Sequence, residues 1–411
     1  MKPECSAWNV GRESEPMTTH AATRKFDRLE RRCLTVGGTA LLLSVGGALL
    51  DPTRFFQAYL LGYLFWVGIA LGCLAVLMLH HLVGGRWGFI IQRLLEAGVR
   101  TLPLMALLFL PILLGLKDLY VWARPEAAAA QEILRHKQAY LNSSAFFWRA
   151  VAYFAIWIGA GSVLTMLSDR RDQGTETRPL TRRMLVLSGP GLLLFGVTVT
   201  FAAIDWAMSL EPLWFSSIYG VVFIVGQGLA ALAFVIVATV LLSGQEPLRG
   251  AITPQQLHDL GNLLLAFVML WAYIAFSQFL IIWSGNLPEE IPWYINRMQG
   301  GWGVLAAILI VFHFVAPFLL LLSRSTKRRA RVLAMVATGI LAMRIIDLFW
   351  LTAPAFHPRS FSLHWMDLLL PIGLGGIWLA VFLWHLKRRP LLPLHDPRFA
   401  AVAEPVHGAI V

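Results

Sequence analysis

The chain has 411 residues, of which 57% are hydrophobic and only 14% are charged. Soluble globular domains carry about 25% charged residues, so this composition excludes a water-soluble protein and indicates an integral membrane protein. The net charge of +11 comes from basic residues in short loops between apolar runs, a pattern that argues against a nucleic-acid partner. The three cysteines (Cys5, Cys33 and Cys73) have neither CxxC, CxxCH nor zinc-site spacing, so we expect no metal site and no redox cofactor in this chain.

Ten apolar runs are long enough to cross a bilayer, since a helix that rises ~1.5 Å per residue needs about 20 apolar residues. The sequence therefore predicts an all-α polytopic membrane protein with ten transmembrane helices, at 34–50, 55–83, 99–116, 145–167, 184–204, 215–242, 257–283, 302–323, 332–352 and 363–386. The first run is short, and the second is long enough to tilt. Five prolines inside runs predict kinks: Pro103, Pro111, Pro190, Pro317 and Pro371.

The basic residues predict the orientation of the helices. With ten spans both termini lie on one side, and that side carries 25 of the 34 Lys and Arg residues, against 7 on the other. The positive-inside rule then predicts a cytoplasmic N-terminal arm (1–33), a cytoplasmic C-terminal tail (387–411) and an outer 205–214 connection. The first 33 residues lack a short apolar segment followed by a cleavage site, so we expect no removable signal peptide.

Three short stretches recur at a nearly constant offset. Residues 50–55 match 210–215, residues 96–98 match 259–261, and residues 140–142 match 294–296. The two members of each match lie at equivalent positions in two successive sets of four predicted helices. The sequence therefore predicts two parallel four-helix repeats, at 34–183 and 184–331, followed by two added helices at 332–386.

The connection at 205–220 is unusually rich in functional groups for a turn between two membrane helices. It contains the acids Asp205 and Glu211 and the aromatic residues Trp206, Trp214 and Tyr219. One interpretation is an interfacial aromatic belt with helix caps. The other is that the acids are kept where protons, ions or substrates pass, because acids at the rim of an apolar segment are costly to desolvate.

Three ionisable residues are predicted to lie inside the membrane. Arg344 and Asp347 are three residues apart and share a helix face, which predicts an ion pair. The pair has a structural interpretation and a functional one, in which Arg344 sets the proton affinity of Asp347. His313 is expected near mid-membrane, either hydrogen-bonded to a neighbouring helix or active in proton transfer. It has no second histidine at matched depth, so we expect no haem b site.

The helix predicted at 257–283 has polar groups along its length. His258 and Asp259 lie at its inner end, and Tyr273, Ser277 and Gln278 lie in its outer half. These positions suit a proton path, because short hops need hydroxyls, carboxylates and imidazoles. They are equally consistent with solvated ends and interhelical hydrogen bonds.

A resemblance rests on three stretches, DWAMSLEPLWFSSIYG at 205–220, LHDLG leading into FVMLWAYIAFSQ at 257–278, and WSGNLPEE at 283–290. They resemble the polysulfide-reductase-like (NrfD-like) family, and within it the smaller membrane subunits (ActF) of alternative complex III, the bacterial quinol:electron-acceptor oxidoreductase. The resemblance covers about 34–386 and is most specific in 205–300.

The resemblance implies a cofactor-free subunit in the bacterial inner membrane, beside a larger NrfD-like paralogue that binds quinol. Partner subunits with haem c and iron–sulfur clusters would take the electrons and pass them to cytochrome c or a terminal oxidase. The resemblance also implies proton translocation. By the motif match, the functional positions that the resemblance implies are Asp205, Glu211, His258, Asp259, Tyr273, Ser277, Gln278 and Glu289.

The sequence thus favours a proton-conducting membrane subunit of a quinol-oxidising respiratory complex, which alone catalyses no electron transfer. Two alternatives stay open. The first is a quinone site in this chain, in which Trp206, Trp214 and Tyr219 pack the ring and Asp205 or His364 accepts a proton. The second is a stand-alone secondary transporter.

Overall fold

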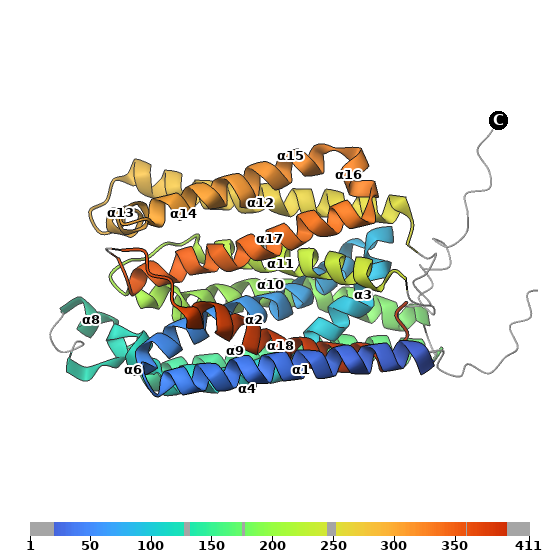
Figure 1. Ribbon diagram of the computed structural model, residues 1–411, viewed down its shortest axis with the longest axis horizontal. Coiled ribbons are helices and arrows are strands. Elements are labelled where there is room, and N and C mark those ends of the chain that lie inside the picture. Colours follow the sequence, from blue (N-terminus) through green and yellow to red (C-terminus); the bar gives the residue numbers. More distant parts are fainter. Residues whose placement is uncertain (1–19, 127–131, 175–176, 245–251, 359, 393–411) are drawn as a thin grey trace, which may run out of the picture.

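The computed structural model describes residues 20–126, 132–174, 177–244, 252–358 and 360–392. Within these ranges all regular structure is helical, and the long helices run side by side along the long axis of the molecule (Figure 1). Nine helical segments there are long and apolar enough to cross a bilayer. The chain is therefore an all-α polytopic integral membrane protein, as its composition predicts, and its apolar helices suit a lipid bilayer.

The nine candidate spans in the described ranges each correspond to one predicted run. They are α2 (Pro52–Val83), the segment Trp87–Leu114, α9 (Ser143–Asp172), α10 (Thr177–Trp206) with the turn η2 (Met208–Leu210), α11 (Tyr219–Leu242), α12 (Pro254–Gly285), the segment Trp302–Leu322, α17 (Ala330–Thr352) with η4 (Ala353–Ala355), and α18 (Trp365–Leu386). The predicted run 34–50 lies largely in α1 (His20–Ala48), whose first half is rich in charge. Because α1 is not among the nine, the tenth span stays a prediction.

The candidate span Trp87–Leu114 differs from the third predicted run, which was placed at 99–116. It begins at Trp87 and is broken into α3 (Arg86–Val99), α4 (Leu102–Leu107) and α5 (Leu110–Leu114), followed by α6 (Leu116–Leu119) and η1 (Val121–Ala123). Pro103 and Pro111 each lie in the first two positions of a new short helix. A proline there lacks only an N–H that has no helical partner, so the kinks predicted at these prolines take the form of helix breaks.

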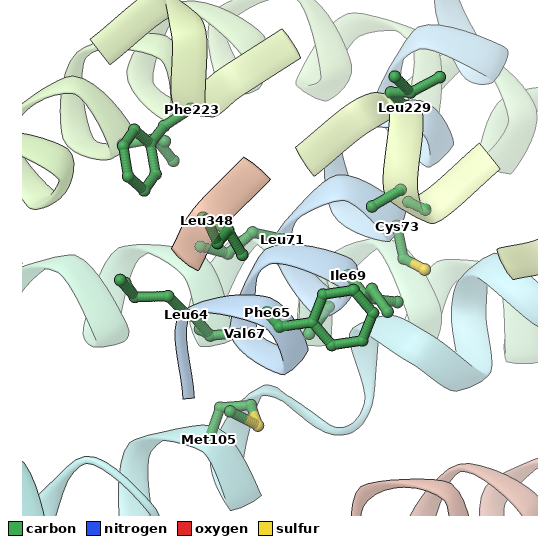
Figure 2. Packing of buried hydrophobic residues seen from close by; sticks show 14 of the residues in the cluster. Leu64, Phe65, Val67, Ile69, Leu71, Cys73, Met105, Phe223, Leu229 and Leu348 are labelled. Carbon is green, nitrogen blue, oxygen red and sulfur yellow. The ribbon is translucent and has the colours of Figure 1, made fainter. Parts of the chain in front are cut away.

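The centre of the molecule is built from α2 and α11. Both helices are apolar on all sides, a pattern that requires burial in protein or in lipid. Figure 2 shows Leu71 and Cys73 of α2 near Phe223 and Leu229 of α11, with Leu348 of α17 beside them. Gly72 of α2 lies so close to α11 that a Cβ built on it would be 2.1 Å from the carbonyl oxygen of Gln227. This close approach fixes the two central helices.

The helices alternate in direction, so their connections fall at two ends of the molecule. The end with the first residue of α1 and the last of α18 is called the terminal side; it also has α16 (Arg324–Arg328) (Figure 1). The opposite end, called the 205–219 side, has α8 (Glu132–Lys137) and α13 (Ile291–Met298). Side-chain caps start several spans, and α12 begins with a capping box between Thr253 and Gln256.

Eight of the spans in the described residues are considered as two groups of four in chain order, which meet at the contact of α2 with α11. The first group is α2, α3–α5, α9 and α10, and the second is α11, α12, the segment Trp302–Leu322 and α17. In each group the first element packs against the second and fourth, and the third packs against the fourth. The segment Trp302–Leu322 consists of α14 (Trp302–Leu309), the π-helix η3 (Ile310–Val315) and α15 (Ala316–Leu322). Outside both groups, α1 packs along α18.

Candidate functional site: a buried acid, arginine and imidazole

The second group encloses a buried ion pair. Arg344 and Asp347 lie on one face of α17, and both side chains are buried. Arg344 Nη1 donates to Asp347 Oδ2, so the predicted ion pair forms. The Trp271 indole N–H of α12 donates to the same oxygen at 3.2 Å. The guanidinium carbon also lies 5.9 Å from the Phe223 ring centroid on α11. Three helices thus contribute to one charged site inside the membrane.

His313 lies beside this pair on the π-helix η3. Its side chain is fully buried, and its ring centroid is 4.3 Å from that of Trp271. Within the described residues neither ring nitrogen has a hydrogen-bond partner. Single π-helical turns in long helices occur frequently at functional sites. We call Trp271, His313, Arg344 and Asp347 the Asp347 cluster.

A glycine makes room for the arginine of this cluster. A Cβ built on Gly226 of α11 would lie 2.3 Å from the guanidinium carbon of Arg344 and 2.4 Å from its Nη1. Any larger side chain at this position would displace the guanidinium from its place between α11 and α17. Gly226 therefore belongs to the site, although its sequence context gave no sign of this.

Asp205 lies in a separate place, in the first group. It is fully buried at the end of α10, where its carboxylate accepts from Arg149 Nε and Nη2 at 2.9 Å each and from the Tyr153 hydroxyl at 2.8 Å. Arg149 also donates to the Tyr140 carbonyl oxygen and lies 3.8 Å over the Tyr140 ring. Burial, followed by the charge of Asp205, raises the pKa of Tyr140 above its usual range. This arrangement ties α9 to α10 by charge-assisted hydrogen bonds.

Glu211 pairs with an arginine from α13. Arg297 Nη2 donates to Glu211 Oε2 at 2.7 Å and to the Leu351 carbonyl oxygen at 2.8 Å. The Arg297 guanidinium also lies 3.6 Å over the Trp293 ring. The pair joins the 205–219 connection to α13 and to the end of α17.

The four residues proposed for quinone contact lie in different packing environments. Trp206 packs against aromatic residues of the first group, while Trp214 stacks on Trp293 at 4.6 Å between ring centroids, with Tyr219 at its edge. His364 caps α18, with its Nδ1 accepting from the Met366 backbone N–H at 3.4 Å. Three grooves found in the described part of the chain contain none of these four.

The candidate residues of α12 lie at different depths. His258 and Asp259 lie near its start on the terminal side, with the His258 ring nitrogen 3.7 Å from the Asp259 carboxylate. Tyr273 is 66% exposed, Ser277 is half-buried and Gln278 is buried. Glu289 is exposed in the connection to α13. Tyr273 therefore faces the surroundings of the bundle rather than its interior.

The sequence interpretation missed a charged network in the first group. Glu96 of α3 accepts from Arg93 at 2.7 Å, from Gln92 at 2.8 Å and from Ser168 of α9 at 2.7 Å. Arg93 also donates to Asp172 at 2.5 Å. The available signal was the three-residue spacing of Arg93 and Glu96, which repeats that of Arg344 and Asp347. Every oxygen of Glu96 is bonded, so the network holds α3 on α9.

The structure thus brings His313, Arg344 and Asp347 together, and it places Asp205 and Glu211 with partners of their own. Within the described residues, no set of three or more His, Cys, Asp and Glu side chains is arranged to hold a metal ion.

No protein-family model matches the chain. No curated protein matches it either.

Proposed function

We propose that this chain is a proton-conducting membrane subunit of a quinol:cytochrome c, or quinol:terminal oxidase, oxidoreductase complex. The observation that carries this proposal is the Asp347 cluster, in which an acid, an arginine and an imidazole are buried together inside a membrane bundle. Ionisable groups inside membranes are expensive to bury and typically mark proton or ion pathways.

Each residue of the cluster has a role in the proposal. His313 takes up a proton on a ring nitrogen, since neither nitrogen has a hydrogen-bond partner among the described residues. The proton then passes to the Asp347 carboxylate, whose proton affinity is set by Arg344 and by the Trp271 hydrogen bond. His258 and Asp259 form the entry on the terminal side, and Glu211 lies toward the exit on the 205–219 side. Because Asp205 is bound by three donors, we assign it to holding α9 and α10 together.

The place of the chain in a complex rests on the resemblance of 205–300 to the NrfD-like subunits of alternative complex III. We propose a larger NrfD-like paralogue as its membrane neighbour, with haem c and iron–sulfur subunits on the 205–219 side. Quinol would be oxidised in the neighbour, in a bacterial inner membrane. The terminal side, with both termini, would be cytoplasmic, as the distribution of basic residues indicates.

We further propose that the two groups of four helices are parallel repeats. The matching packing order of the groups supports this, with units that begin at α2 and α11. The sequence match of 50–55 with 210–215 also supports it, since 50–55 spans the start of α2 and 210–215 ends four residues before α11. These units begin one helix later than the predicted 34–183 and 184–331, and they leave α1, as the tenth span, paired with α18.

The test is proton translocation by the reconstituted complex. Asp347→Asn and His313→Phe should each lower the protons moved per quinol oxidised, while the haem c and iron–sulfur subunits still co-purify. Glu126→Gln is the matched control, because Glu126 is an exposed acid on the 205–219 side, and it should translocate as the wild type does.

Two outcomes would contradict the proposal. Full proton translocation in both cluster variants would remove the conducting role. Purification of the chain alone or as a homo-oligomer, without haem c and iron–sulfur proteins, would remove the complex and favour a secondary transporter.

A further inference from the structure

A groove on the terminal side combines three arginines with an apolar floor. It lies between the last turns of α9 and the first turns of α10 and has a volume of about 720 Å³. Its floor is formed by Val163 and Leu167 of α9 and by Val186 and Leu187 of α10. Arg178, Arg182 and Arg183 line it toward the end of the bundle.

The three arginines have no acidic partner among the described residues. All three are exposed, and within the described residues none of them forms an ion pair. The acids at the end of α9 are engaged elsewhere, Asp169 with Arg100 and Asp172 with Arg93. Arg178 and Arg182 are one helical turn apart, so they present two guanidinium groups on the same face of α10.

The apolar floor continues as a strip along α10. Val186 and Leu187 are exposed, and exposed apolar side chains follow at Leu193, Val197 and Phe201. At 1.5 Å per residue, the strip from 186 to 201 is roughly 22 Å long, enough to accompany an acyl chain through one leaflet. The positive charge therefore lies at the start of an apolar track rather than on an open polar surface.

We propose that this groove binds one anionic phospholipid, with its phosphate on Arg178, Arg182 and Arg183 and an acyl chain along α10. Basic pockets between membrane helices bind anionic lipid headgroups in this way. The membrane places such lipids at this depth, and three cations at the rim that form no ion pair with any described residue favour an anionic headgroup over a zwitterionic one. The inference depends on membrane insertion alone and is independent of proton conduction.

The test is native mass spectrometry of the full-length protein, titrated in detergent with dioleoylphosphatidylglycerol or dioleoylphosphatidylcholine. The wild type should retain one phosphatidylglycerol per chain and should prefer it over phosphatidylcholine. The triple variant R178Q/R182Q/R183Q should bind phosphatidylglycerol on the order of a hundredfold more weakly, since each arginine near the membrane surface strengthens binding about fivefold. The matched control R324Q/R329Q/R331Q removes the same charge from exposed arginines on the same side, outside the groove, and should bind normally.

A second variant tests the apolar floor of the groove while leaving its charge unchanged. Val186→Trp keeps all three arginines and fills the floor at an exposed position, so the helix bundle is unaffected. It should also lose the bound phosphatidylglycerol. Equal losses in the two triple variants, or normal binding in Val186→Trp, would show general surface charge instead of a site. Displacement of the lipid by inorganic phosphate would show a free-anion site and overturn the assignment.

Discussion

Replacing Gly72 with alanine tests whether the contact between α2 and α11 fixes the centre of the bundle. The added Cβ would lie 2.1 Å from the Gln227 carbonyl oxygen and 2.7 Å from the Ala231 Cβ. Neither atom can rotate away, because one belongs to the backbone and the other is fixed to it. Ordinary contact needs more than 3 Å, so the two helices must separate by on the order of 1 Å.

The size of the effect follows from two opposing contributions. Overpacking of this kind destabilises by about 1–3 kcal/mol, and the rigid partners here place Gly72→Ala at the upper end. Alanine gains roughly 0.8–1 kcal/mol of helix propensity over glycine, which offsets part of the cost. We therefore expect Gly72→Ala to lower the free energy of unfolding by about 1–2 kcal/mol.

Gly68→Ala is the matched control, one turn earlier on the same helix. Its Cβ would meet only the flexible Gln227 Cγ, at 3.4 Å, so the propensity gain should remain and the variant should be as stable as the wild type or slightly more stable. Reversible unfolding in mixed detergent micelles measures both free energies. Equal stability of the two alanine variants would refute the assigned close approach.

Three further predictions concern Asp205, Gly226 and His357. Asp205→Asn leaves Arg149 without its bidentate acid, and it should destabilise the contact of α9 with α10 by about 1–3 kcal/mol, seen as a lower unfolding temperature. Gly226→Ala should displace the Arg344 guanidinium and lower proton translocation in the reconstituted complex as Asp347→Asn does, whereas unchanged translocation would exclude this contact. Burial, followed by the nearby charge of Arg54, lowers the pKa of His357 below its usual 6.5, so its contribution to stability is complete above pH 6.5 and declines as the pH falls below it. Melting temperatures between pH 8 and 5 should therefore fall less in His357→Gln than in the wild type.

The buried acids Asp205, Glu96 and Asp347 differ in their hydrogen-bond partners. Asp205 and Glu96 each accept three hydrogen bonds from neighbouring side chains, so both carboxylates are engaged in holding helices together. Asp347 instead accepts from Trp271, whose ring lies 4.3 Å from that of His313, and both His313 ring nitrogens are free among the described residues. This difference is why the proposed proton path passes through the second group. The sequence alone could not separate these acids, because all three lie at or inside apolar runs.

The nature of the protein and most of its helices were determined by the sequence itself. Span length is a local property, because a run of about 20 apolar residues matches the hydrocarbon thickness whatever its neighbours are. The ion pair of Arg344 with Asp347 was equally local, since a three-residue spacing brings two side chains together on any helix. The start of the span Trp87–Leu114 was not, because Arg93 and Glu96 interrupt its apolar pattern, and only the folded structure shows that these charges are paired and buried.

The partners of the other acids were decided only by the tertiary structure. Asp205 meets Arg149, and Glu211 meets Arg297, across sequence separations that no periodicity encodes. The proximity of His313 to Trp271 likewise depends on how the π-helix packs against α12. Helix formation is settled within each segment by its own hydrogen bonds, but the pairing of charges in a bilayer depends on which helices become neighbours, and that is settled by packing over the whole chain.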